Sequence, residues 1–488
     1  MNPSRSLFLR SGAALGLTMA LSACASVPDL GPRAEPRTPA SIAAAQSLSA
    51  TSDVAWLADG WWQSYGDPQL SRLIAEGLRD SPDAAAAAAR LRQAQGMAQS
   101  AGAPLLPSIG VNASAGLDKQ SYNVGIPAQF VPKGWQDVGQ AAVNLSFDLD
   151  LWGRNRAALA AATSDAEAAR IEQDQARLML ATAIASAYAD LARLHAERDV
   201  FASAAELRLA TQKLVSDRVR NGIDTRAELK QADAAVPLAR ADLIAADESI
   251  ALVRNQLAAL VGAGPDRGLS ITRPVLTALH PSGLPARLTT DLIGRRPDIA
   301  AARARAQAAA SRVKVAHADF FPAISLGALV GVRSLGLANL TDSGSTYGNV
   351  TPAISLPIFR GGALSGQYRG ARGRYDEAVA LYNGTVITAY REVADTVTSQ
   401  RATADRLAQS RQALADSEDA YSIARKRYEG GLSTYLNVLT SEERLLQARR
   451  AVADLDARMF ALDVALVRAL GGGFTAPVQA PAKENPNG

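Results

Sequence analysis

The sequence is poor in cysteine and histidine, two residues from which catalytic and metal sites are often built. It has one cysteine and three histidines in 488 residues. A single cysteine excludes an intrachain disulfide. His195, His280 and His317 are scattered without the spacing of metal ligands, and neither a nucleophile elbow nor a phosphate-binding loop is present. We therefore expect no enzyme, no cofactor and no bound metal.

Aromatic residues are also scarce, and neither sign of charge is in large excess. Aromatic residues make up 5% of the chain, and 51 basic residues are interspersed with 47 acidic ones, so the net charge is only +4. Because the basic residues do not cluster, we expect no nucleic-acid partner. Abundant alanine and a mean hydropathy of −0.02 favour long helices that pack through small residues over a compact aromatic core.

The single cysteine, Cys24, ends a candidate export signal. Arg5 and Arg10 precede an apolar stretch, Ala13 to Leu21, which is too short to span a bilayer comfortably as a helix. The four residues ending at Cys24, Leu-Ser-Ala-Cys, resemble the lipobox of bacterial lipoproteins. This resemblance implies a signal peptide at 1–23 and a mature protein whose Cys24 carries N-palmitoyl and S-diacylglycerol groups. An ordinary signal peptide with an incidental cysteine is the alternative.

The rest of the chain contains an internal duplication. Leu78 to Gly116 aligns without a gap with Ile293 to Gly331, 215 positions later. Further along the offset becomes 209, where the segment beginning at Asn221 meets the one beginning at Gly430. Such long units indicate a doubled half-molecule and not a solenoid. We place an acylated, extended linker at 24–60, the first repeat at 61–262, a connection at 263–284, the second repeat at 285–471 and a flexible tail at 472–488.

Each repeat contains two segments in which apolar and polar residues alternate. These segments predict strands at about 108–118, 138–151, 323–333 and 350–359, each about as long as a tilted transmembrane strand. Four strands cannot close a barrel, and open sheet edges are not tolerated in lipid. Three chains would supply twelve strands. The alternative is a soluble four-stranded sheet with one face packed on helices.

Long helices fill the remainder of each repeat. The stretch 154–219 has no proline and would reach roughly 100 Å as a helix. Columns of apolar residues spaced seven apart, such as Val438, Leu445 and Val452, indicate coiled-coil packing with neighbours on both sides. A helix in the wall of a tube needs that arrangement. The predicted long helices span 154–219, 224–261, 362–428 and 433–470.

In this order, the motifs resemble the outer-membrane factor (TolC-like) family, in its NodT-like branch of RND efflux outer-membrane lipoproteins. The residues that carry the resemblance are Trp62–Leu70, Ser81–Asp83, Phe147–Arg154, Arg295–Ile299, Leu356–Gly362 and Arg427–Leu439. The resemblance implies an internally duplicated α+β membrane protein. Its coiled-coil helices would form an α-barrel, and its four transmembrane strands per chain would be completed as a 12-stranded β-barrel in a homotrimer.

The family also implies partners and a function. The duct would sit in the lipid of the outer membrane of a Gram-negative bacterium and export small molecules or drugs delivered by a periplasmic adaptor and an inner-membrane RND-type pump. It would perform no chemistry itself. A type I protein-secretion duct is an alternative with the same body. A non-conducting coiled-coil structural lipoprotein is an alternative of another class, which explains Cys24 and the heptads but not four alternating strands.

The resemblance implies site residues at the inner end of the tunnel. Gly222, Gly430 and Gly431 would lie at helix–helix turns that need positive backbone angles, where an adaptor docks. Family members commonly carry aspartates in the helix just after the second turn. This chain has Asn437 and Thr440 there, so we name Tyr435, Asn437 and Thr440 as aperture candidates. Nearby sources of negative charge are Asp224, Glu228 and Glu443.

Overall fold

The computed structural model describes residues 27–38, 41–44, 46–48, 55–123, 125, 127–275, 284–285 and 288–476. Cys24, with the predicted signal peptide, lies outside these ranges, as do His280 and the tail beyond residue 476. The chain divides into two compact units. Unit 1 comprises 1–36, 92–168 and 302–382, and unit 2 comprises 37–91, 169–301 and 383–488.

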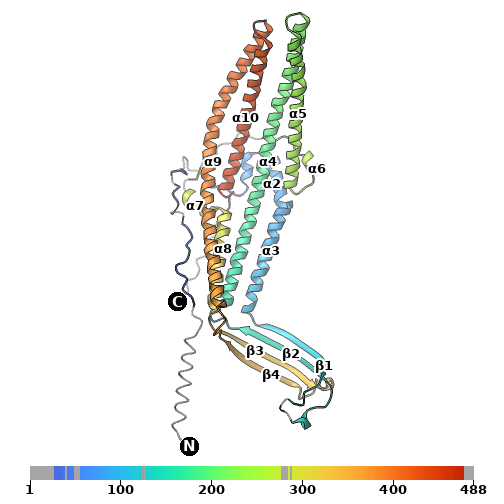
Figure 1. Ribbon diagram of the computed structural model, residues 1–488, viewed down its shortest axis with the longest axis vertical. Helices are drawn as coiled ribbons and strands as arrows, with labels where there is room; N and C mark the ends of the chain where they lie inside the picture. Colours follow the sequence, from blue (N-terminus) through green and yellow to red (C-terminus); the bar gives the residue numbers. More distant parts are fainter. Residues whose placement is uncertain are drawn as a thin grey trace. The chain divides into compact units, whose positions relative to one another are not determined.

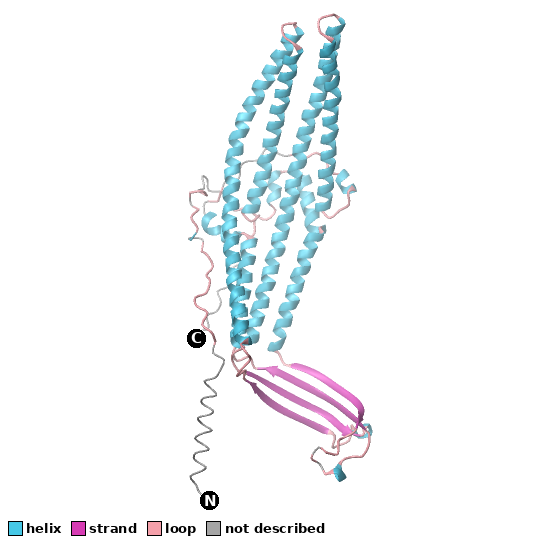
Figure 2. Ribbon diagram, in the orientation of Figure 1, coloured by secondary structure: helices cyan, strands magenta, loops and turns pink. Residues whose placement is uncertain are grey.

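Unit 1 contains a four-stranded antiparallel sheet in the order β1-β2-β3-β4 (Figure 2). Two strands come from each repeat. Strands β1 and β4 therefore form the two edges, and each leaves one side of its backbone without a strand partner within the described sheet. The strands are β1 (Ser108–Asp118), β2 (Gln136–Asp148), β3 (Ala323–Leu335) and β4 (Thr346–Ser355).

Strand β1 has its predicted range, β2 begins at Gln136 instead of 138, and β3 ends at Leu335 instead of 333. Strand β2 ends at Asp148 instead of 151, because Asp150 adopts a φ of 43° and its carboxylate accepts bonds from the amides of Asn155 (2.8 Å) and Arg156 (3.0 Å). Asp150 thus serves the start of the next helix. Strand β4 spans 346–355 instead of 350–359, and Pro352 is tolerated within it because β4 is an edge strand.

Most of the residues that the structure describes lie in six long helices (Figure 1). Helices α4 and α9 each contain 67 residues, consistent with alanine-rich sequence free of proline. Among the described residues, none of the helices combines the length and apolarity needed to cross a membrane. The six are α3 (Pro82–Gly102), α4 (Arg154–Arg220), α5 (Arg226–Leu260), α8 (Pro297–Ala318), α9 (Ala363–Glu429) and α10 (Tyr435–Ala469).

The seven-residue columns point inward within unit 2. Val438, Leu445 and Leu466 of α10 are each at most 3% exposed, and Ile250 and Leu257 of α5 are at most 4% exposed. Burying such side chains stabilises the helix pairs by roughly 1.5–3 kcal/mol each. Helical packing along heptads therefore sets how α4, α5, α9 and α10 associate in this unit.

The tryptophan-rich motif at the start of the first repeat builds the main core of unit 2. A short 3₁₀ helix, η2 (Trp61–Tyr65), precedes α2 (Pro68–Asp80). Asp67 caps α2 through the amides of Gln69 and Leu70, and its other oxygen accepts the Tyr188 hydroxyl at 2.7 Å. The Tyr65 hydroxyl donates to Asp463 at 2.6 Å. The motif thereby joins α2 to helices from both repeats.

A glycine closes each repeat at an equivalent place in unit 2. Gly262 has a φ of +80°, and a Cβ there would lie 2.6 Å from the Asp80 carbonyl oxygen. Gly471 has a φ of +91°, and a Cβ there would overlap the Arg295 carbonyl. Both contacted residues lie just before a Pro-Asp helix start, Pro82 or Pro297. The duplication therefore includes a close backbone approach that only glycine permits.

The segment predicted as an extended linker is fastened along part of its length. Within unit 1, Val27 and Leu30 pack on a cluster formed by α8 and α9. The Tyr375 hydroxyl donates to the Ala34 carbonyl (3.1 Å), and Arg372 donates to the carbonyl of Pro32. The remaining short elements are η3 (Ala103–Leu105), η4 (Ala128–Phe130), α6 (Asp266–Leu269), α7 (Leu288–Arg295) and η5 (Leu337–Asn339).

Candidate functional site

The register of the sheet gives it one continuous apolar face. Residues that pair directly across antiparallel strands lie on the same side. Val111 pairs with Val143, and Val143 pairs with Val330, so three strands contribute valine to one row. Val111 is 72% exposed and Val350 is 71% exposed. The large apolar members of this face are Ile109, Val111, Leu117, Val143, Leu145, Phe147, Ile324, Leu326, Val330, Val332, Val350 and Ile354.

The opposite face is mostly polar or small, and Val138, Leu329 and Leu335 are its large apolar members. Ser114, Gln140 and Arg333 form one row of it by the same pairing. Its polar uncharged members are Ser108, Asn112, Ser114, Gln136, Gln140, Asn144, Ser146, Ser325, Tyr347, Asn349, Thr351 and Ser355. An apolar face of this extent is unfavourable in water and suited to lipid, whereas the other face suits an aqueous space.

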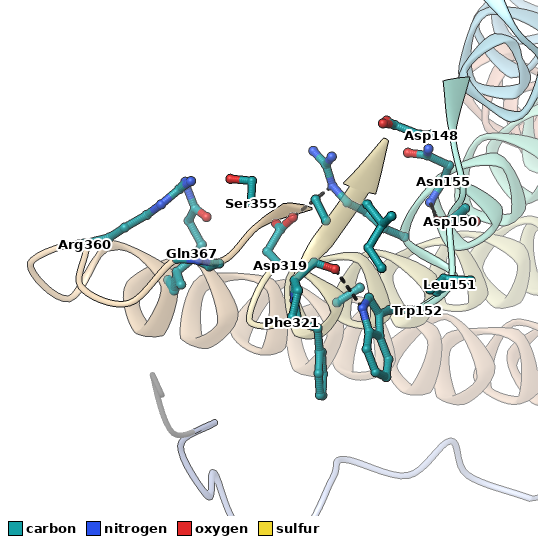
Figure 3. Close-up of a pocket in the computed structure, with 17 residues that line it drawn as sticks. Asp148, Asp150, Leu151, Trp152, Asn155, Asp319, Phe321, Ser355, Arg360 and Gln367 are labelled. Atoms are coloured by element: carbon teal, nitrogen blue, oxygen red, sulfur yellow. Dashed lines mark hydrogen bonds and ion pairs between the residues drawn. The ribbon is translucent and has the colours of Figure 1, made fainter. Parts of the chain in front are cut away.

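A cavity of about 320 Å³ lies in unit 1 where strands join helices (Figure 3). Beside it, the Trp152 ring stacks on Phe321 at 4.7 Å between centroids, and its indole Nε1 donates to the Pro322 carbonyl at 2.8 Å. Arg154 pairs with Asp319 at 2.9 Å. These bonds join the end of β2 to the start of β3, so the motif around Trp152 has a structural role.

In unit 2, the two long helical hairpins end in turns with the same backbone. Gly222 and Gly431 both have a φ of +71°. After each glycine, one amide reaches back across the turn: Ile223 to the Arg218 carbonyl (2.9 Å) and Leu432 to the Arg427 carbonyl (2.7 Å). An added Cβ would meet nothing within 4 Å at either glycine. Positive φ, and not crowding, therefore requires glycine at these turns.

The prediction that Gly430 needs a positive backbone angle is wrong. Among the described residues, Gly430 is not one of the glycines with a positive φ. Its amide donates to the Lys426 carbonyl at 3.0 Å, as the next residue of a helix does. Gly430 is equivalent to Asn221 of the other turn, and the positive φ belongs to the next residue, Gly431.

The two hairpin ends are joined by a cluster that we call the tip cluster, formed by Arg218, Asp224 and Tyr428. Arg218 Nε lies 2.9 Å from Asp224 Oδ2, and their side chains are 11% and 7% exposed. Arg218 Nη1 donates to the Tyr428 carbonyl at 2.9 Å, and its guanidinium lies 4.5 Å from the centre of the Tyr428 ring. The Tyr428 hydroxyl donates to Asp224. The cluster therefore links the first repeat to the second.

Electrostatics hold this cluster in one protonation state. Partial burial acts to raise the Asp224 pKa, but bonds from Arg218 and Tyr428 and the Arg218 charge outweigh it and lower that pKa. Burial and the bond to Asp224 raise the pKa of Tyr428. At neutral pH the carboxylate is thus charged and the phenol is protonated, which is the pairing that a charge-assisted hydrogen bond requires.

Behind the tip cluster lies a second ionic contact between repeats. Glu442 of α10 is 1% exposed and lies 3.1 Å from Arg208 of α4. Burial raises the Glu442 pKa, and Arg208 opposes that shift. Arg208 also donates to the Ala235 carbonyl of α5 at 3.4 Å. Three helices therefore converge on one buried pair.

The three aperture candidates differ in how exposed their side chains are. Tyr435 is 3% exposed and packs with Val215, Tyr421 and Tyr428, so its ring does not line a passage in this conformation. Asn437 is exposed. Thr440 is also exposed, and its hydroxyl donates to the Leu436 carbonyl at 2.9 Å.

The three candidate sources of negative charge differ in whether their carboxylates are already bonded within the chain. Glu228 accepts the Thr225 amide at 2.7 Å in a capping box, and Asp224 is committed to Arg218. Glu443 is exposed. Among these candidates in the described chain, Asn437, Thr440 and Glu443 are exposed, and Glu228 is half-buried.

Sequence reasoning missed Arg218 and Glu442, and it quoted Tyr428 only within a motif. One signal was available: at the offset of 209, Asp224 meets Ser433 while Arg218 meets Arg427. An acid present in only one of two matched turns points to a contact that the copies do not share. Its partner on the other hairpin was not readable from sequence.

Comparisons with known proteins agree with this geometry. A sheet with one lipid-compatible face and one polar face is expected of strands in an outer-membrane barrel. The family model described as outer membrane efflux protein matches residues 73–263 and 288–472, and the chain belongs to this family. The family predicted from sequence is confirmed. The described residues contain no group of three or more His, Cys, Asp or Glu side chains that could hold a metal ion.

Relatives and solved structures support the same function. The chain is 36% identical over 366 residues to the fusaric acid resistance protein FusA of Burkholderia cepacia, covering 73% of this chain and 68% of FusA. It is 29% identical over 470 residues to the multidrug resistance outer membrane protein MdtP of Escherichia coli K12, covering 95% and 96%. The outer membrane protein VceC of Vibrio cholerae is similar in structure, with a TM-score of 0.82, 46% identity and coverage of 86% and 100%. The chain is an outer-membrane efflux channel.

Proposed function

We propose that three copies of this chain form one duct through the outer membrane. The two-faced sheet with two open edges carries the proposal. Pairing β4 of one copy with β1 of the next satisfies both edges, places the apolar face toward lipid and turns the polar face toward an aqueous lumen. Three copies give a barrel of twelve strands. The long helices of unit 2 form the periplasmic wall.

The proposed anchor is lipid on Cys24. The lipobox supports it, and so does the docking of Val27 to Ala34 on α8 and α9, which fixes the chain shortly after the cysteine. Lipid chains anchor a protein without spanning the bilayer. A Cys24→Ser variant should lose labelling by palmitate, and retained labelling would contradict the assignment.

The proposed partners are a periplasmic adaptor and an inner-membrane RND-type pump. The turns at Gly222 and Gly431 support docking there, because Ile223 beside one glycine is 60% exposed and Leu432 beside the other is 71% exposed. Exposed apolar side chains on a rigid turn suit a partner's apolar surface. Replacing both glycines with valine should abolish crosslinking to the adaptor and leave the trimer intact. Asn221→Ala is the matched control, since it alters the turn without demanding a new backbone.

The proposed cargo is small organic molecules, and the chain itself performs no chemistry. The names of FusA and MdtP refer to resistance against fusaric acid and multiple drugs, which favours small-molecule efflux over protein secretion. The tip cluster closes the periplasmic end. Opening must separate the hairpins of the two repeats and therefore break the bond between Tyr428 and Asp224.

The deciding experiment measures the mass in detergent and the conductance in a planar bilayer on one preparation. A trimer with discrete conductance steps supports the duct. A monomer contradicts it. A trimer that stays silent even after Tyr428→Phe loosens the tip contradicts conduction and favours the structural lipoprotein.

A further inference from the structure

One charge stands out on the polar face of the sheet. Asp118 and Asp148 lie at the ends of their strands, at the margins of this face. Arg333 is the one cation among the described strand residues of that face, and it sits opposite Gln140 in the register. The nearer acid, Asp118, pairs with Gln136, four residues from Gln140 and so about 13 Å along the strand.

Arg333 is held in place by its backbone, and its side chain is exposed. Its amide donates to the Ser345 carbonyl at 2.8 Å, just beyond the last paired residues of β3 and β4. Among the described residues, no salt bridge involves Arg333. Asp137 is three residues before Gln140 but pairs with Leu117 and therefore lies on the apolar face, where its carboxylate accepts the Leu337 amide at 2.7 Å.

We propose that Arg333 is a selectivity-determining residue, which favours the passage of anionic solutes over cations. The inference rests on the trimeric duct proposed above. In that duct the polar face lines the lumen, so three copies of Arg333 form a ring of positive charge near the loop end of the strands. The face is otherwise uncharged between its ends, so the ring dominates the potential within one Debye length, about 10 Å at 0.1 M salt.

Arg333 can act on solutes in the lumen because it lies on the polar face of the sheet. An arginine on the apolar face would destabilise the protein at mid-membrane depth, whereas a residue that lines the lumen tunes selectivity without that cost. The neighbours in its row, Ser114 and Gln140, are polar and uncharged. They leave the guanidinium charge uncompensated, so it acts on passing solutes.

The test is the anion-to-cation permeability ratio from reversal potentials in a KCl gradient at low ionic strength. Every variant carries Tyr428→Phe, so that all have the same loosened tip. Arg333→Gln should lower the ratio about threefold or more, and Arg333→Glu should lower it further, because unit charges interact appreciably at this range. Arg333→Lys should keep the original ratio. Lys133→Gln removes an equal charge from the β1–β2 connection and is the matched control.

The outcomes are separable. An unchanged ratio in Arg333→Gln, with steps of normal conductance, overturns the role of Arg333 and leaves the duct standing. A shift of equal size in Lys133→Gln also overturns it, because the effect would then come from diffuse charge at the mouth. Absence of conductance in every variant overturns the duct itself. A shift specific to position 333 that disappears at 1 M salt establishes the ring.

Discussion

Replacing Tyr428 with phenylalanine removes one hydroxyl from the tip cluster and leaves the ring in place. The hydroxyl donates to Asp224, whose side chain is 7% exposed, so the bond is shielded from water. Arg218 remains paired with Asp224 and keeps the carboxylate charged. The variant therefore tests a single bond between the two repeats without leaving a buried charge unpaired.

The size of the effect follows from the type of bond. A hydrogen bond to a charged group contributes about 1.5–3 kcal/mol, which corresponds to roughly 10- to 150-fold in an equilibrium constant. If opening separates the hairpins, the closed state alone contains this bond. The ratio of open to closed channels should rise by that factor.

The assay is the open probability of single trimers in a planar bilayer. Arg425→Gln is the matched control, because it breaks an exposed pair with Glu429 (2.9 Å) on the same helix, one turn earlier. Such a surface pair contributes only about 0.3–0.5 kcal/mol. Equal open probabilities in Tyr428→Phe and Arg425→Gln, with intact trimers, would refute the tip cluster as the closure.

Three further predictions follow from the structure. The Asp224 pKa is lowered, so the contribution of its charged form to the closed state is complete above the ordinary carboxyl pKa and is lost as the pH falls through the lowered value. The open probability should therefore stay constant between pH 7 and 5 and rise below about pH 4, and a rise already at pH 6 would contradict this. Gly471→Ala should lower the melting temperature of the trimer and reduce its stability by about 2–4 kcal/mol, because the new Cβ would overlap the Arg295 carbonyl. Gly222→Ala, where nothing crowds the Cβ, should reduce the stability by only about 1–2 kcal/mol, and equal losses of stability would refute the close approach at Gly471. Val143→Arg should cost roughly 2–4 kcal/mol and reduce trimer in the outer membrane, while Asn144→Arg on the other face should assemble normally; the reverse pattern would invert the assignment of the faces.

Local patterns in the sequence determined the elements. Alternation with period two is a property of a strand, and apolar columns seven apart are a property of packed helices, so both were readable without tertiary information. The helix α4 begins at Arg154 as predicted and ends one residue later than predicted. The strand ends were less accurate because capping decided them: Asp150 leaves β2 to serve α4.

Contacts between the repeats were decided only by the tertiary structure. Arg218 and Tyr428 are 210 positions apart, and no periodicity connects them. Tyr435 follows a turn glycine and suggested an aperture, but helix packing buries it.

The duplication in the sequence thus determined a doubled strand-and-helix body with its family and general function. The packing of one repeat against the other decided which of the near-equivalent residues form the tip cluster. A sequence pattern reports the faces of each element, whereas partners across the fold depend on how those faces are brought together in space.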